Sequence, residues 1–140
     1  AGFGAAARAT TQADASRMAA LRDRLEAGLK KASPDGVIFG AGVPRLPNTT
    51  LFAVPGMKEE TAIIAFDLNS IAVSSGSACS SGKITASQVL AAMGVDPALA
   101  RGAVRVSIGR TTTEAEMERF LGTWISLVGS LLKQGREIAA

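Results

Sequence analysis

The spacing of hydrophobic positions predicts two long helices, one on each side of the middle of the chain. Residues 5–31 are rich in alanine, and four apolar side chains recur there every three or four residues, which places them on one helix face: Met18, Leu21, Leu25 and Leu29. Thr113 and Glu116 have the spacing of a capping box. The helix that they start is predicted to run to about residue 133. It has a broad apolar face made of Met117, Phe120, Leu121, Trp124, Ile125, Val128, Leu131 and Leu132.

Shorter elements fill the region between these helices. Short apolar runs bounded by glycine, proline and asparagine predict four strands, at residues 37–39, 49–54, 71–73 and 103–108. Two more helices are predicted at residues 58–68 and 85–93, and a helical turn starts at Asp96-Pro97. The helix at 58–68 has Ala62, Ile63 and Phe66 facing inward, with Ile64 as a fourth candidate. The helix at 85–93 has the capping-box pair Thr85 and Gln88 at its start and Gly94 at its end.

This order of elements predicts an α+β fold. We expect a small sheet of three to four short strands covered by helices mainly on one face, with a long N-terminal helix and an amphipathic C-terminal helix. The strands are too few and too short for a doubly wound nucleotide-binding fold. The sequence also lacks the GxGxxG and GxxxxGK[ST] patterns of such folds.

Composition excludes several classes of function. Lysine and arginine exceed aspartate and glutamate by only 15 − 12 = 3, without a basic run, so nucleic acid is a poor partner. The chain has no histidine and a single cysteine, which argues against a zinc site of its own and excludes histidine acid–base catalysis and an internal disulfide. No apolar run is long enough to span a membrane, and no signal peptide is recognisable. A reducing, cytoplasmic location is predicted. Because the sequence begins with Ala1, we expect a processed, trimmed or cut product.

The single cysteine lies in a stretch of small residues. Residues 74–82 read SSGSACSSG, and such a segment has little apolar surface to bury, so residues 74–83 are predicted to form a mobile loop outside the core. An isolated cysteine in a soluble domain is more often a buried apolar residue than a reactive thiol. Here, however, the neighbours of Cys79 leave it accessible. Lys83 is the nearest cation, and solvation is its simplest role. The loop predicts a sulfur atom that can visit more than one place.

Arg105 is the second candidate site residue. It lies in the strand predicted at 103–108, at the register opposite to Val104 and Val106. It can be a solvent-facing or ion-paired arginine, which is the commoner case. It can also be a bidentate clamp for a substrate carboxylate, which suits the planar guanidinium. Arg110 is a weaker candidate that is expected to support the turn and the start of the last helix.

Three segments resemble the C-terminal part of the cysteine desulfurases of the NifS/IscS type, which are class-V aminotransferase-like enzymes. They are RLPNT at 45–49, IAVSSGSACSSG at 71–82 and VRVSIGRTT at 104–112. Their order and spacing match the family, and the resemblance covers nearly the whole chain. It implies the small domain of a fold-type I enzyme that depends on pyridoxal 5'-phosphate. By this resemblance, residues 1–32 connect to a missing large domain, and residues 33–140 form the small domain with the cysteine loop.

The resemblance also implies an activity. The family takes sulfur from L-cysteine, releases L-alanine and leaves a persulfide on the loop cysteine, which Cys79 matches. Arg105 matches the residue that binds the substrate carboxylate. The sulfur passes to an iron–sulfur scaffold or another acceptor protein, where Cys79 can briefly serve as a cluster ligand. The full-length enzyme is expected to be a homodimer.

One departure from the family is large. Its Schiff-base lysine, stacking histidine and phosphate-binding residues belong to the large domain, and none has a counterpart here. The isolated chain is therefore expected to be inactive. Two alternatives remain open: a non-catalytic module that docks onto partner proteins, and a thiol sulfur carrier that works without pyridoxal phosphate.

Overall fold

The computed structural model describes the backbone of residues 2–76 and 87–138 and the side chains of residues 2–76 and 87–130. Within these ranges, four short strands form one sheet in the order β1-β2-β4-β3. Each neighbouring pair is antiparallel. The strands are β1 (Val37–Ile38), β2 (Thr49–Ala53), β3 (Ser74–Ser75) and β4 (Val104–Ser107).

Three predicted strands are confirmed, but the strand predicted at 71–73 is wrong. The preceding helix ends with Ser70 in the left-handed region at a φ of 55°, and the Ile71 N–H donates to the Phe66 carbonyl. The chain is therefore still closing the helix at residue 71 and reaches β4 only at Ser74. Ile71 and Val73 instead pack against the core as partly buried residues.

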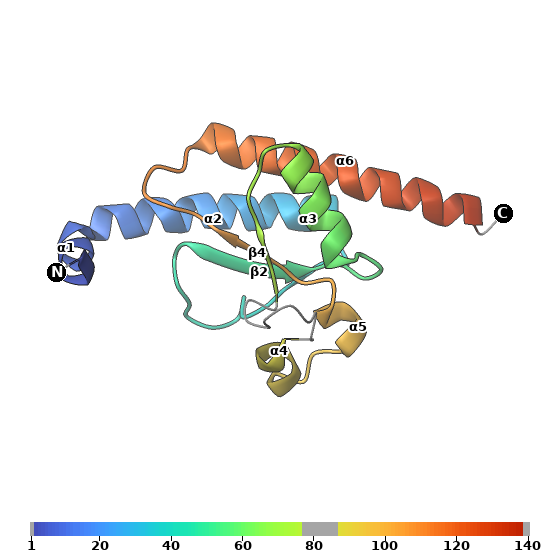
Figure 1. Cartoon of the computed structure of the whole chain (residues 1–140), viewed down its shortest axis with the longest axis horizontal. Helices are drawn as coiled ribbons and strands as arrows, with labels where there is room; N and C mark the ends of the chain where they lie inside the picture. The colour runs from blue at the N-terminus through green and yellow to red at the C-terminus, as the bar shows by residue number, and fades with distance from the viewer. Residues whose placement is uncertain (1, 77–86, 139–140) are drawn as a thin grey trace.

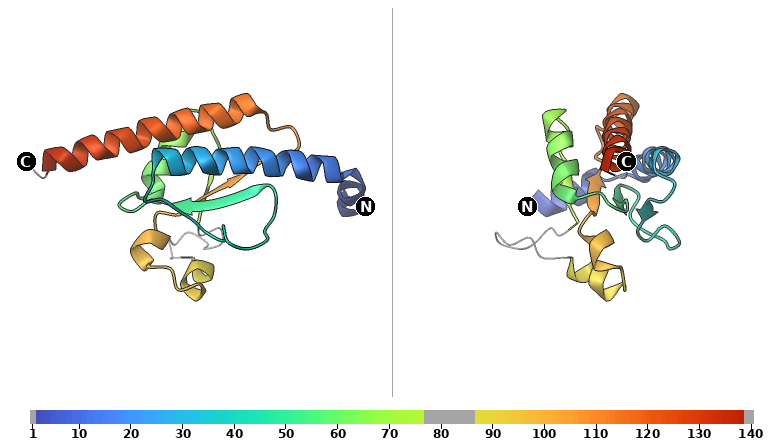
Figure 2. Two further views of the ribbon diagram at one scale, coloured as in Figure 1. Left: turned by 180° about the vertical axis from the view of Figure 1, so that it is seen from behind. Right: turned by 90° about the vertical axis from the view of Figure 1, so that its right-hand side faces the viewer.

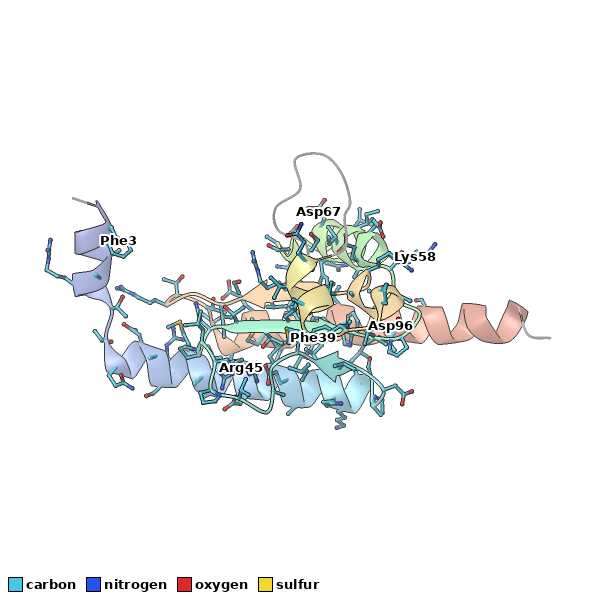
Figure 3. All side chains as sticks on the ribbon, turned by 90° about the horizontal axis from the view of Figure 1, so that it is seen from below. Phe3, Phe39, Arg45, Lys58, Asp67 and Asp96 are labelled. Atoms are coloured by element: carbon cyan, nitrogen blue, oxygen red, sulfur yellow. The ribbon has the colours of Figure 1, made fainter. Side chains whose placement is uncertain are left out.

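Six helices surround the sheet in the described part of the chain. They are α1 (Gly2–Ala9), α2 (Gln12–Ala32), α3 (Glu59–Leu68), α4 (Gln88–Ala92), α5 (Pro97–Ala100) and α6 (Glu114–Ile138). The prediction of one helix over 5–31 is wrong, because Thr11 interrupts it. Thr11 has an extended backbone and its hydroxyl accepts from the Asp14 N–H, so it caps a new helix. The first helix, α1, has no buried residue, and Phe3 is exposed at its end (Figure 3).

The other helix ends follow simple capping chemistry. The capping box at the start of α6 is confirmed: the Thr113 N–H donates to Glu116 Oε2 at 2.7 Å, and the Glu116 N–H donates to Thr113 Oγ1 at 3.3 Å. Asp96 caps α5 ahead of Pro97, as predicted. The helix predicted at 85–93 is shorter, because Ser87 is its N-cap. Thr85 lies outside the described residues. Gly94 ends this helix with a φ of 73°.

The helices lie mainly on one face of the sheet, which confirms the predicted architecture. The helices α2 and α6 run side by side across that face together with α3, and α4 and α5 lie on the opposite side (Figures 1 and 2). The last turns of α6 extend past the sheet. The helix α2 thus belongs to the layer that covers this face of the sheet.

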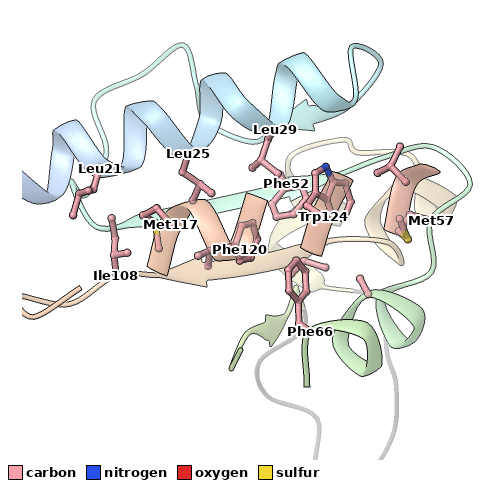
Figure 4. Packing of buried hydrophobic residues seen from close by; sticks show 14 residues of the cluster. Leu21, Leu25, Leu29, Phe52, Met57, Phe66, Ile108, Met117, Phe120 and Trp124 are labelled. Carbon is pink, nitrogen blue, oxygen red and sulfur yellow. The ribbon is translucent and has the colours of Figure 1, made fainter. Parts of the chain in front are cut away.

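The main core lies between the sheet and the three larger helices (Figure 4). The α2 leucines predicted to face inward are buried, and Trp124, Phe120 and Phe66 fill the centre. The Phe66 and Phe120 rings stack with centroids 4.4 Å apart, and Phe52 meets Trp124 edge-on at 4.9 Å. Ile125, predicted to face inward, and Ile64, a further candidate for the inward face of its helix, are both more than half exposed. Leu131 and Leu132 lie outside the described side chains.

A smaller apolar cluster covers part of the opposite sheet face. Ala53 of β2 and Ala103 next to β4 pack there with Leu90 of α4 and Ala100 of α5. Because strand side chains alternate between faces, Phe52, Val104 and Val106 point to the main core, while their neighbours point to this second side. This alternation fixes which face Arg105 occupies.

Candidate functional site

Arg105 lies near the middle of the sheet, where β4 has a neighbour on each side. Its cross-strand partners are Leu51 in β2 and Ser74 in β3. Val104 and Val106 are buried in the main core, so Arg105 points to the opposite face, as the sequence pattern predicted.

The guanidinium of Arg105 is incompletely satisfied. Its Nε is buried and has no hydrogen-bond partner among the described residues. Its Nη2 donates to Ser74 Oγ at 3.4 Å. None of the ion pairs formed by the described residues involves Arg105. The side chain is therefore neither an exposed nor an ion-paired arginine within the described structure. A buried donor without an acceptor is unfavourable, so this Nε–H can bind an acceptor that the described residues do not supply.

The start of the cysteine segment is held firmly against β4. Ser74 and Ser75 pair with Arg105 and Val104, and the Gly76 N–H donates to the Ala103 carbonyl at 2.8 Å. A Cβ at Gly76 would lie 2.6 Å from the Ala103 Cβ, so this close approach requires glycine. Cys79 and Lys83, the other predicted features of loop 74–83, lie outside the described residues.

A buried carboxyl lies near the same point. Glu59 begins α3 and is only 7% exposed. Burial raises its pKa, and the negative charge of Glu60 raises it further, while the Gly76 N–H partly opposes both effects. No sequence pattern predicts this burial, because an acidic residue in the first turn of a helix is usually solvated.

A second polar cluster anchors the segment that carries the RLPNT motif. Arg45 donates to both oxygens of Glu26 at 2.6 Å, and the buried Thr50 hydroxyl donates to one of them at 2.7 Å. Burial raises the pKa of Glu26, but the hydrogen bonds from Arg45 and Thr50 and the nearby positive charges outweigh it, and the net pKa is lowered. Arg45 lies beside α2 in Figure 3, and Arg22 of α2 donates to the Leu46 carbonyl at 2.9 Å. Periodicity does not reveal this cluster, because its members lie far apart in the sequence.

Arg110, the weaker candidate from the sequence, makes a structural contact. Arg110 is exposed and donates to the Ala9 carbonyl at 3.0 Å, so it links the β4–α6 turn to the end of α1. Among the side chains of residues 2–76 and 87–130, no cluster of three or more potential metal ligands occurs. None of the described helices is long and apolar enough to cross a bilayer.

The described lysines do not fit a covalent pyridoxal phosphate site. Lys30 Nζ donates to the Gly36 carbonyl at 2.7 Å and so closes the end of α2. Lys31 and Lys58 are exposed on helix termini. The sequence contains no histidine that could stack on a pyridine ring. The described residues therefore supply neither the lysine nor the stacking histidine of such a site.

Comparison with known proteins gives a consistent result. Residues 1–120 match the family model for aminotransferase class-V. The chain is 42% identical over 108 residues to cysteine desulfurase 2 of Trichormus variabilis, covering 77% of this chain and 27% of the relative. It is 38% identical over 130 residues to the cysteine desulfurase of Cereibacter sphaeroides, covering 93% of this chain and 34% of the relative.

A solved structure extends this likeness to the fold. The NifS-like protein from Rickettsia africae superposes with a TM-score of 0.73 at 34% sequence identity, covering 83% of this chain and 29% of that one. This chain thus spans about a quarter to a third of the length of the relatives that it matches. The family as a whole depends on pyridoxal phosphate, and the relatives are enzymes that act on L-cysteine. The architecture, the sequence likeness and the matched family model together place this chain in the class-V aminotransferase family, among homologues of the NifS-type cysteine desulfurases.

Proposed function

We propose that the chain acts as the C-terminal part of a cysteine desulfurase. In this proposal Cys79 accepts sulfur from L-cysteine as a persulfide, L-alanine is released, and Arg105 binds the substrate carboxylate. The observation that carries the proposal is the buried Arg105 Nε, which has no acceptor among the described residues of a chain whose family acts on an amino acid.

The position of Arg105 suits carboxylate binding. Its backbone is held between two strands, so the guanidinium is carried by a rigid part of the molecule. The fork of a guanidinium can donate two parallel hydrogen bonds to a carboxylate. A substrate carboxylate would supply the missing acceptor and compensate the partly buried positive charge.

The reaction at Cys79 balances without an added oxidant. The Cys79 thiolate attacks the substrate sulfur, a sulfur–sulfur bond forms, and the carbon–sulfur bond of the substrate breaks. The electron pair of that bond remains with the carbon, which is then protonated. L-cysteine and the Cys79 thiol thus become L-alanine and a Cys79 persulfide. The acceptor, such as an iron–sulfur scaffold protein, takes the terminal sulfur in a second exchange, during which Cys79 can serve as a cluster ligand.

We further propose that the cofactor-binding lysine lies outside this chain. In the complete enzyme, pyridoxal phosphate would act as the electron sink for the substrate amino acid. The places of Lys30, Lys31 and Lys58 support this proposal. Residues 1–32 would then connect to the cofactor-binding domain and residues 33–140 would form the small domain of a cytoplasmic homodimer. The isolated chain would not turn over cysteine.

The test uses the chain alone and a hybrid enzyme. In the hybrid, this chain replaces the matching segment of the Cereibacter sphaeroides cysteine desulfurase, which aligns with 93% of it. We expect no alanine release by the chain alone with L-cysteine and pyridoxal phosphate, and clear release by the hybrid. Mass spectrometry should find one extra sulfur atom on Cys79 that a reductant removes. Turnover by the chain alone, or an inactive folded hybrid, would contradict the proposal.

Matched variants distinguish the roles of the two residues. In the hybrid, Cys79→Ser should abolish sulfur labelling. Arg105→Lys should raise the KM for L-cysteine roughly 10- to 100-fold, because a charge-assisted bidentate contact contributes about 1.5–3 kcal/mol. Arg110→Lys is the matched control and should change the KM less than about twofold. If the chain alone gains sulfur from an intact desulfurase but the hybrid does not turn over, the carrier alternative is favoured. No labelling in either experiment favours a docking module.

A further inference from the structure

The strand β3, with which the cysteine loop at residues 74–83 begins, also carries the one acceptor that the described residues offer to Arg105. Ser74 lies directly opposite Arg105 in the β3–β4 pair. Its hydroxyl oxygen accepts from Arg105 Nη2 at 3.4 Å, and Arg105 Nε has no acceptor in the described structure. Among the described residues, Ser74 is thus the one side chain that accepts a hydrogen bond from the guanidinium.

Ser74 is itself fixed by backbone contacts. It lies on an edge strand of two residues, and such a short pairing would fray if nothing else held it. The Gly76 N–H bond to the Ala103 carbonyl, at 2.8 Å, holds its far end. The close approach of Gly76 to Ala103 allows little sliding of β3 along β4. The Ser74 backbone, and with it the Cβ that carries the hydroxyl, is therefore held in place by the strand pairing.

The long arginine side chain needs such a support. A free guanidinium loses rotamer freedom when it binds a ligand, at a cost that weakens binding. A neighbouring acceptor that already selects one rotamer removes part of that cost. The contact uses an Nη2 donor and leaves the buried Nε–H available, so support and substrate binding do not compete for the same hydrogen atom.

We propose that Ser74 is a positioning residue that orients Arg105 for the substrate carboxylate. The strand that enters the cysteine segment would then also set the geometry of the substrate-binding arginine. This inference rests on the proposed function for its consequence in substrate binding, but the contact itself can be tested without turnover.

The first measurement uses NMR of the chain alone. The Arg105 Nε–H signal is assigned by its disappearance in Arg105→Lys. Because this group is buried, we expect its exchange with water to be slow in the native chain. Ser74→Ala should shift the signal and speed its exchange by about tenfold, and Ser74→Thr, which keeps the hydroxyl, should restore both. Ser107→Ala is the control. Ser107 is exposed and lies on β4 with Arg105, so its replacement should leave the Nε–H signal unchanged.

The second measurement uses the hybrid enzyme described above. Ser74→Ala should raise the KM for L-cysteine about fivefold with kcat within about twofold, and Ser74→Thr should recover the KM. In an Arg105→Lys background, Ser74→Ala should add little, because the two residues act as one unit. Thermal unfolding of each variant checks that the fold is intact.

The two proposals fail in different ways. An unchanged Nε–H signal in folded Ser74→Ala overturns the positioning role. If the KM is unchanged in Ser74→Ala but raised in Arg105→Lys, the positioning role of Ser74 is also overturned. The proposed role of Arg105 in substrate binding is then unaffected. A folded hybrid without turnover contradicts the proposed function, and the NMR measurement then still decides whether Ser74 orients Arg105.

Discussion

The partly buried Glu26 and the buried Glu59 have opposite electrostatic environments. Glu26 accepts hydrogen bonds from Arg45 and Thr50, which outweigh the effect of its burial and lower its pKa. Glu59 is buried beside the negative Glu60, and its pKa is raised by that burial and that charge. The difference comes from the partners rather than from the residue type.

The raised pKa of Glu59 predicts a distinct dependence of stability on pH. A carboxyl with a higher pKa in the folded chain holds its proton more tightly when folded, so its contribution to stability is greatest at low pH. That contribution falls as the pH rises from the unfolded pKa through the folded one. Glu59→Gln should remove this dependence, so its advantage over the native chain in free energy of unfolding should grow as the pH rises across that window.

Urea unfolding of both chains at a series of pH values measures this difference. In a Glu60→Gln background, the difference in free energy of unfolding that Glu59→Gln causes should be smaller. This variant removes the negative charge that is the second cause of the raised pKa of Glu59. A constant difference between native chain and Glu59→Gln across the window would refute the assignment.

At the scale of whole elements, the contact between α2 and α6 depends on a glycine. A Cβ at Gly28 would lie 2.6 Å from Leu121 Cδ1, whereas a Cβ at Gly122, one residue farther along α6, would meet nothing within 4 Å. Both glycines lie inside helices, where alanine is favoured by up to about 1 kcal/mol. Their different surroundings allow the packing contribution to be separated from helix propensity.

Gly122→Ala should therefore raise the free energy of unfolding by up to about 1 kcal/mol. Gly28→Ala should be less stable than Gly122→Ala by roughly 1–3 kcal/mol, because Leu121 must move to admit the new methyl group. Chemical denaturation followed by far-UV circular dichroism measures both values. In a Leu121→Ala background the clash is absent, and Gly28→Ala should then stabilise. If it destabilises equally in both backgrounds, the contact with Leu121 is not the cause.

At the scale of the whole molecule, one aromatic cluster joins both layers. Trp124 of α6 is fully buried, contacts Phe52 of the sheet edge-on and lies parallel to Phe66 of α3. Its indole N–H donates to the buried Ser33 hydroxyl at 3.2 Å, which closes the end of α2. A single side chain thus connects the sheet with all three helices of the main layer.

Trp124→Ala should destabilise the chain by about 3–5 kcal/mol, a large part of the roughly 5–15 kcal/mol typical of a domain. Ser33→Ala should cost about 1–3 kcal/mol, because it leaves the indole N–H buried and unpaired. Ile125→Ala, at the exposed position next to Trp124 on α6, should change stability by less than about 0.5–1 kcal/mol. Urea unfolding followed by circular dichroism suits these variants, since Trp124 is the only tryptophan. If Trp124→Ala lowered the free energy of unfolding only slightly, other contacts would have to hold the sheet and the helices together.

Local patterns predicted most of the elements because the causes of those elements are local. The leucines of α2, the capping box of α6 and the alternation in β4 act over a few residues, so they can be read from the sequence. The errors occur where two local preferences compete. Thr11 lies in a helical pattern but also caps a helix. Ile71 and Val73 have the composition of a strand but lie where α3 is still being closed.

The α+β class, the inward faces of the long helices and the register that puts Arg105 on the other face from Val104 and Val106 can all be read from local sequence patterns. The sequence also carries the resemblance to cysteine desulfurases. The folded chain alone reveals that Arg105 Nε is buried without a partner among the described residues, that Ser74 lies across from Arg105 and that Glu59 is buried near Gly76. The physical reason is distance along the chain: Ser74 and Arg105 are brought together by sheet pairing, and burial depends on every element that covers a residue. Neither the pairing of distant strands nor the burial of a residue can be read from the nearby residues that a periodic pattern compares.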